Sequence, residues 1–141
     1  MRAVVQVCRG ASVHVGGEQI GGFEGPGLLV LVGVTHTDSD ADAHKLAGKI
    51  WGLRIMDDEL SASDLDAPLL VVSQFTLYAD LSKGRRPSWS AAARQPVSEP
   101  LVQALVDALG ELGATVTTGR FGADMQVSLV NDGPRTIIVD V

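Results

Sequence analysis

The sequence contains little cysteine, few aromatic residues and no long apolar segment. Of its 141 residues only Cys8 is a cysteine, and 4% are aromatic. A lone cysteine excludes a disulfide within the chain, so we expect a protein of the reducing cytoplasm. Because Cys8 stands in a short apolar segment, we interpret it as a core residue and not as a nucleophile. No apolar run approaches the length that spans a bilayer, and no membrane partner is expected.

Positive charge is scarce as well. Lys and Arg number 11 and Asp and Glu number 17, which gives a net charge of -6. This balance excludes a protein that coats nucleic acid, because such proteins are basic overall, but it allows a local patch that contacts only the end of a nucleic acid. The one basic cluster lies in residues 80–89. We predict phosphate contacts there for Lys83, Arg85 and Arg86, with a solvated loop as the alternative.

The patterns of common metal and catalytic sites are missing. His14, His36 and His44 have no ligand spacing with one another or with Cys8, so we predict no metal and no other cofactor. The chain has no glycine loop of the P-loop type. No histidine lies near a polar motif in the sequence, although a Ser-His-Asp set could still assemble from distant segments.

The hydrophobic pattern predicts several strands. Apolar stretches at 3–8, 27–34 and 69–72 are typical of strands, and Gly16-Gly17 predicts a hairpin turn. We also expect a short strand and three closing strands, at 53–56, 114–118, 125–130 and 136–141.

Two amphipathic segments predict helices. The first follows possible N-cap residues at 38–40 and carries Leu46 and Ile50 on one face, and the second extends from Glu99 to Leu112. The sequence therefore predicts an α/β fold. We expect a single three-layer domain over 1–141, in which two helices pack on a sheet and the early and late strands make a second sheet layer.

Small polar residues follow the apolar run at 69–72. Ser73 and Thr76 offer hydroxyl groups, Gln74 offers an amide, and the backbone offers N–H groups near Phe75. In α/β proteins ligands usually bind where such a buried strand ends. These groups can bind an ester or a carbonyl, but without a strong acid or base they do not activate a nucleophile.

A second polar segment lies at 131–136, after another apolar strand. Asn131-Asp132-Gly133-Pro134 is typical of a turn. The alternative is functional, because a Gly-Pro bond adopts the cis form readily and could hold its two carbonyl groups toward a ligand.

The two segments resemble the motifs of the D-aminoacyl-tRNA deacylases, which are small editing enzymes of translation. The segment 73–77 matches their Ser-Gln-x-Thr-Leu motif, and 131–136 matches their Asn-x-Gly-Pro-x-Thr motif. Residues 86–88 and 118–125 are also similar to family sequence, and the resemblance extends from Met1 to Val141.

The resemblance implies a cytoplasmic homodimer that takes part in translation quality control. Such a hydrolase cleaves the ester between a D-amino acid and the 3′-terminal adenosine at the acceptor end of tRNA, and the 2′-hydroxyl of that adenosine assists the attack. Rigid carbonyl groups close to Cα would leave room for hydrogen but not for a side chain. A site of this kind rejects L-amino acids, accepts many D side chains and also admits glycine.

The resemblance also assigns roles to residues. The backbone N–H at Phe75 would hold the reacting group, and three side chains would line and orient the substrate: Ser73, Gln74 and Thr76. Gly133 and Pro134 would face the substituents on Cα from the partner subunit, so the active site would span the subunit interface.

Two of these roles have alternatives. Thr76 could instead be a covalent nucleophile, although no base is visible beside it. Phe75 or Phe121 could stack on the adenine, with core packing favoured for Phe121.

Two positions depart from the family pattern. Val7 stands where the family usually has an arginine in the first strand, and Arg135 stands where a small apolar residue usually follows Gly-Pro. We predict that Arg135 is a third selectivity residue, which fixes the Gly-Pro segment in place of the missing first-strand arginine. One alternative is that Arg9, on the same strand face as Val7, replaces that arginine. Another is that Arg135 extends into solvent.

The departures leave three functional hypotheses. The first is a strict D-aminoacyl-tRNA deacylase. The second is a chirality-relaxed deacylase that also removes small L-residues such as alanine, because the related animal enzymes place arginine after a trans Gly-Pro. Those enzymes, however, usually have Pro-Gln where this chain has Ser73-Gln74. The third is a module that binds the tRNA acceptor end without turnover.

Overall fold

Two long antiparallel strands form the centre of the fold in a computed structural model that describes all residues 1–141. Strand β1 (Arg2–Val15) and strand β2 (Glu18–Gly33) are joined at Gly16 and Gly17. Both glycines have positive φ, 59° and 87°, as a two-residue hairpin turn of this hand requires. The predicted hairpin is therefore confirmed.

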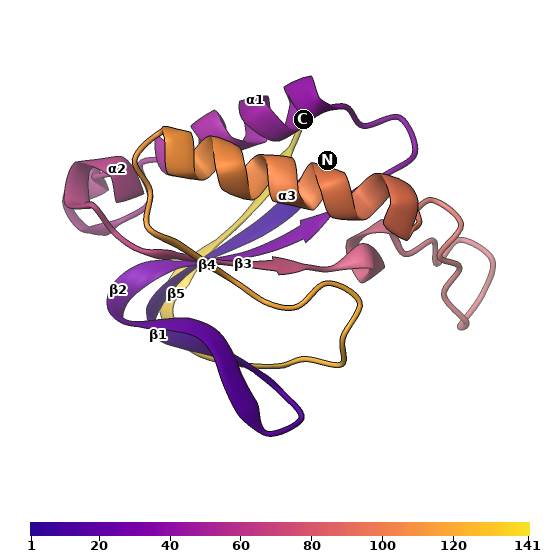
Figure 1. Ribbon diagram of the computed structural model, residues 1–141, viewed down its shortest axis with the longest axis horizontal. Helices are drawn as coiled ribbons and strands as arrows, with labels where there is room; N and C mark the ends of the chain where they lie inside the picture. Colours follow the sequence, from indigo (N-terminus) through magenta and orange to yellow (C-terminus); the bar gives the residue numbers. More distant parts are fainter.

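The two strands belong to one five-stranded mixed sheet, in the order β4-β3-β2-β1-β5 (Figure 1). Strand β3 (Leu69–Ser73) pairs in parallel with β2, and β4 (Val116–Thr118) pairs in parallel with β3. Strand β5 (Gln126–Asp140) pairs antiparallel with β1 and forms one outer edge of the sheet. The parallel pairs β4-β3 and β3-β2 thus make up one half of the sheet, and the antiparallel pairs β2-β1 and β1-β5 make up the other half.

The helices lie on one face of this sheet (Figure 1). Helix α1 (Asp40–Trp51) begins at a capping box, in which Ser39 and Asp42 satisfy each other's backbone N–H groups. Helix α3 (Gln95–Glu111) lies beside α1, and a short helix, α2 (Ala62–Leu65), follows the turn η1 (Asp57–Glu59). None of these helices has the length and apolar composition that crossing a membrane would need.

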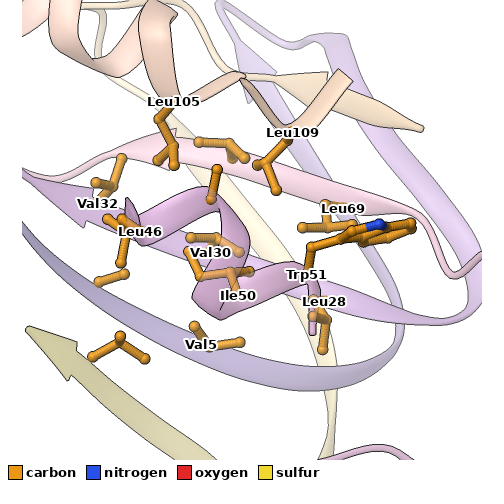
Figure 2. Packing of buried hydrophobic residues seen from close by; sticks show 14 of the residues in the cluster. Val5, Leu28, Val30, Val32, Leu46, Ile50, Trp51, Leu69, Leu105 and Leu109 are labelled. Carbon is orange, nitrogen blue, oxygen red and sulfur yellow. The ribbon is translucent and has the colours of Figure 1, made fainter. Parts of the chain in front are cut away.

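The main core lies between the two long helices and the sheet. Figure 2 shows Leu46 and Ile50 of α1 and Leu105 and Leu109 of α3 directed toward the strands, and all four are fully buried. The sheet contributes Val5, Val7, Leu28, Val30, Val32, Leu69 and Val71 to the same cluster. Burying a side chain of this size stabilises the fold by about 1.5–3 kcal/mol. The expected α/β class, with two helices packed on a sheet, is confirmed.

The second layer comes from the same strands and not from a separate sheet. At Gly10 (φ 100°) the pairing of β1 shifts its register, and the far half of the β1–β2 hairpin bends across the open face. A smaller buried cluster results, made of Cys8, Ala11, Val13, Leu29, Leu70 and Val72. The early and late strands therefore form the expected layer, but they stay continuous with the first sheet.

Three local predictions were wrong. Residues 53–56 form no strand, because the chain turns there: the Ile55 N–H donates to the Leu53 carbonyl oxygen at 3.0 Å and no sheet strand pairs with the segment. Helix α3 begins at Gln95 and not at Glu99, since proline is well tolerated in a first helical turn and Pro96 occupies such a position. The strands expected at 125–130 and 136–141 are one continuous strand, β5, which contains Gly133-Pro134 as a cis peptide. Of the two interpretations of residues 131–134, the separate turn is therefore not observed.

Two glycines give a matched pair of stability predictions. A Cβ on Gly21 would lie 2.5 Å from the backbone carbonyl oxygen of Thr118, so Gly21→Ala should destabilise the fold by about 1–3 kcal/mol. Gly110 lies in α3 with no heavy atom within 4 Å of a new Cβ. Gly110→Ala should stabilise by about 0.5–1 kcal/mol because alanine is the better helix former. Urea denaturation measures both, and a Gly21→Ala variant as stable as Gly110→Ala would contradict the pair.

Candidate active site

A short helical turn at the end of β3 holds the first polar motif. The turn η2 (Phe75–Tyr78) begins directly after Gln74, whose backbone N–H donates to the carbonyl oxygen of Val32 at 2.7 Å. The side-chain amide of Gln74 donates to the Thr76 hydroxyl at 2.5 Å. This contact fixes the hydroxyl oxygen, while Ser73, Gln74 and Thr76 all remain partly exposed.

The turn leaves backbone donors free. The Leu77 N–H donates to the Gln74 carbonyl oxygen at 3.2 Å, which closes the turn. Phe75 and Thr76 come before Leu77 in this turn, and their N–H groups have no acceptor within the chain. This is usual for the first donors of a helical turn. The predicted donor at Phe75 is therefore available to a ligand.

A pocket of about 330 Å³ opens beside this turn. One wall is made by β3 and η2, and another by the segment 121–127, which in Figure 1 crosses on the side of the sheet opposite to the helices. Ser98 and Val102 of α3 line a further side of the pocket. The residues that line it include Val72, Ser73, Gln74, Phe75, Phe121, Asp124 and Met125. A pocket of this size matches those that hold small organic ligands.

Phe121 departs from its predicted place. Its side chain is only partly buried and lines the pocket wall, and it belongs to neither buried cluster. The favoured core packing of Phe121 was therefore wrong, because the chain from β4 to β5 passes outside the core. Asp124 and Met125 were missed as wall residues. Their membership of the family-like stretch 118–125 was the signal that could have found them.

No nucleophile is paired with a base in the pocket. Asp124 is the one ionisable side chain on its wall, and it is exposed. His36 and His44 contact backbone oxygens of Ser90 and Asp40 and do not line the pocket. Cys8 is fully buried, and burial raises the pKa of its thiol, which keeps it protonated and unreactive. No group of three or more His, Cys, Asp or Glu side chains is arranged to hold a metal ion.

The basic cluster lies next to the pocket. Lys83, Arg85 and Arg86 are all exposed, in a loop that is closed at its base by the pairing of Asp80 with Ser88. Trp89, which ends this loop, packs edge-on against Phe75 with 5.3 Å between the ring centroids and an angle of 78°. Two partly exposed aromatic rings therefore join the basic loop to the turn that carries the free N–H groups.

The second polar motif lies far from the first within one chain. By the strand register, Gly133-Pro134 lies beside Val7, which pairs with Leu28, and Leu28 pairs with Leu69. Ser73 lies four residues further along β3. With strands about 4.8 Å apart and about 3.3 Å per residue along them, roughly 20 Å separate the two motifs. The structure does not bring the two predicted parts of the site together within one chain.

Arg135 does not extend into solvent. Its guanidinium donates to the Asp57 carboxylate at 2.8 Å, to the Asp132 carboxylate at 2.8 Å and to the Ile55 carbonyl oxygen at 3.3 Å. Its Nε donates to the carbonyl oxygen of Asp132, at 3.4 Å. The alternative of a solvent-exposed Arg135 was wrong, because acidic groups from two segments surround its side chain.

Fold and pocket together define an α/β protein with a ligand site at the end of a central parallel strand, lined by hydroxyl, amide and N–H groups. Comparison with known proteins identifies the family to which the chain belongs. The family model for D-Tyr-tRNA(Tyr) deacylase matches residues 4–140. The chain therefore belongs to the D-aminoacyl-tRNA deacylase family.

Curated relatives match over their whole length. The D-aminoacyl-tRNA deacylase of Streptomyces coelicolor is 63% identical over 141 residues, which cover 100% of both chains. That of Cutibacterium acnes is 64% identical over 140 residues, which cover 99% of this chain and 97% of the relative. These identities agree with the family resemblance that the two sequence motifs indicated.

Solved structures share the fold. A structure described as c-Myc DNA Unwinding Element Binding Protein is 36% identical, with a TM-score of 0.93 over 100% of this chain and 99% of the other. A probable eukaryotic D-amino acid tRNA deacylase superposes with a TM-score of 0.82 at 17% identity, over 99% of this chain and 98% of the other. The second likeness shows the fold alone.

Proposed function

We propose that this protein hydrolyses the ester of D-aminoacyl-tRNA and of glycyl-tRNA and rejects L-aminoacyl-tRNA. The observation that carries the proposal is the pocket beside η2, which Ser73, Gln74 and Phe75 line without a catalytic base. Thr76 does not line the pocket itself, and its hydroxyl is bonded to the Gln74 amide that does. Curated relatives at about 60% identity over the full chain carry the name of this activity. A tRNA substrate and a single free cysteine support a cytoplasmic location.

The pocket favours a reaction in which the RNA supplies the hydroxyl group. The N–H of Phe75 would stabilise the developing oxyanion, and Ser73, Gln74 and Thr76 would orient the ester. Thr76 is a poor candidate for covalent attack, because its hydroxyl already accepts a hydrogen bond from Gln74 and no base lies beside it. Phe75 and Phe121 are placed on the pocket wall, where either ring could stack on adenine.

We also propose that the enzyme is a homodimer whose active site spans the interface. Gly133-Pro134 lies too far from Ser73 to complete the pocket of its own chain, so a second copy has to supply it. Strand β5 is an outer strand and exposes large apolar side chains, Val130 at 62% and Ile138 at 67%. Exposed apolar residues on an unpaired sheet edge are typical of a surface that binds another chain.

A chirality-relaxed deacylase is the second candidate. The Val7 side chain is buried in the core and has no hydrogen-bond donor, whereas Arg135 contacts the residue that precedes Gly133-Pro134. An arginine placed differently from the usual one could hold the Gly-Pro carbonyl groups differently, which would admit a small L side chain.

Deacylation of matched tRNAs tests both candidates. Purified protein should release D-tyrosine and glycine from tRNA and leave L-tyrosyl-tRNA intact. Release of L-alanine at enzyme levels that clear the D-substrate would favour the relaxed enzyme. Binding without turnover of any aminoacyl-tRNA would leave only the acceptor-end binding module.

The basic loop should act on binding and not on chemistry. Replacing Lys83, Arg85 and Arg86 together by alanine should raise KM and leave kcat nearly unchanged, because these side chains lie outside the pocket. The dependence of log KM on log[salt] should weaken by roughly 0.7–0.9 for each phosphate that the variant no longer neutralises. Lys45→Ala on α1 is the matched control, and an equal effect of that variant would contradict a local tRNA contact.

A further inference from the structure

Four charged side chains gather beside Gly133-Pro134. Asp132 accepts from Arg135 at 2.8 Å and faces Arg9 at 3.3 Å, both through the same carboxylate oxygen. Asp57 faces the same two arginines through its two oxygens, Arg135 at 2.8 Å and Arg9 at 3.6 Å. Two positive and two negative groups thus form a closed cluster that joins β1, β5 and the turn η1.

Arg135 is the centre of this cluster. Its side chain is 24% exposed, against 56% for Arg9, and its donors are taken up by acceptors from two segments, 55–57 and 132. A guanidinium engaged in this way is fixed in its plane and is not free to bind a phosphate. Arg135 therefore binds carbonyl oxygens and carboxylates of its own chain.

The contact with the backbone lies directly before the Gly-Pro dipeptide. The carbonyl oxygen of Asp132, which accepts from Arg135 Nε, belongs to the peptide that joins Asp132 to Gly133. A rotation of the guanidinium would break this 3.4 Å contact with the peptide that directly precedes the dipeptide. The other end of the guanidinium is held by the Asp57 carboxylate and the Ile55 carbonyl oxygen, which both accept from Nη1 and oppose such a rotation.

We propose that Asp57 is a positioning residue for substrate selectivity, acting through Arg135 on Gly133-Pro134. The inference rests on the proposed function, since selectivity presupposes that the protein cleaves aminoacyl-tRNA. Asp57 lies outside the sheet and touches neither the pocket nor the dipeptide. Its carboxylate holds one side of the Arg135 fork while Asp132 holds the other, and it draws in Arg9 as a second positive partner.

The variant Asp57→Asn separates positioning from stability. The Asp57 side chain is 66% exposed, and exposed ion pairs stabilise a fold little, so Tm should stay near that of the wild type. The ratio of kcat/KM for D-tyrosyl-tRNA to that for L-alanyl-tRNA should fall about tenfold, because the loosened dipeptide rejects the side chain less strictly. Asp57→Glu, which keeps the charge, should recover part of the ratio.

Asp58→Asn is the matched control. Asp58 is the next residue of the same turn, is exposed and makes no contact with either arginine, so its ratio should equal that of the wild type. An Asp57→Asn ratio within about twofold of the wild type, or a parallel loss on both substrates, would overturn the proposal.

A double-mutant cycle tests whether Asp57 acts through Arg135. In an Arg135→Gln background the further change Asp57→Asn should have no effect on the ratio, whereas additive effects would overturn the proposed route. Failure of the proposed function is distinguishable, because the wild-type protein would then cleave no aminoacyl-tRNA, and the inference would fall with it. If the wild type is selective and the Asp57→Asn variant is equally selective, the inference about Asp57 is overturned while the proposed function stands.

Discussion

Replacing the 2′-hydroxyl of the terminal adenosine by hydrogen should abolish deacylation of D-aminoacyl-tRNA by this protein. The pocket holds donors for the ester and no base beside a nucleophile, and in the proposed reaction the attack therefore uses a hydroxyl group that the substrate supplies. Loss of a positioned hydroxyl that takes part in proton transfer should lower the rate by about 10³-fold or more, which leaves no measurable turnover. Single-turnover deacylation of tRNA that ends in 2′-deoxyadenosine measures this.

Two protein variants serve as controls for that experiment. Thr76→Ala should lose only about tenfold in rate, because in the proposed reaction the hydroxyl positions the substrate and does not attack the ester. Asp124→Asn should retain activity, since an exposed carboxylate on the wall is not required as a base. A trapped acyl-Thr76 enzyme, or full turnover of the 2′-deoxy substrate, would contradict the RNA-assisted reaction.

The second large effect is expected from Ile138→Glu. Ile138 is 67% exposed on the edge strand β5, where we place the contact between subunits. A buried carboxylate without a partner would prevent association, and a monomer would have a pocket without Gly133-Pro134. We expect a folded monomer with deacylation of D-aminoacyl-tRNA lowered by on the order of 100-fold.

Sedimentation velocity and deacylation of one sample measure both outcomes together. Leu65→Glu is the matched control, because Leu65 is an exposed apolar residue (46%) on α2, away from β5. That variant should remain dimeric and active. A monomeric wild type, or a monomeric Ile138→Glu protein with normal activity, would disprove the interface-spanning site.

Much of the fold could be predicted because its signals are local. The hairpin follows from Gly16-Gly17, and α1 follows from the N-cap at Ser39 and the apolar spacing of Leu46 and Ile50. The segment 53–56 was mistaken for a strand because its residues suit an extended backbone, and only the complete sheet shows that no neighbouring strand is available.

The candidate site was predictable in its motifs but not in its wider surroundings. Ser73–Thr76 stood out because polar residues follow a buried strand. Asp57 gave no signal, since an acidic residue in an acidic loop has the composition of a solvated surface. Its pairing with Arg135, 78 residues away, depends on how η1 folds against β5.

The roughly 20 Å between Ser73 and Gly133-Pro134 has a genetic consequence. Each complete site would draw its ester-binding turn from one chain and its selective dipeptide from the other. A chain with a ruined turn and a chain with a ruined dipeptide, each inactive alone, would therefore form mixed pairs in which one site is built entirely from sound parts. Two defective alleles of such a gene should complement each other in one cell, whereas two alleles damaged in the same segment should not.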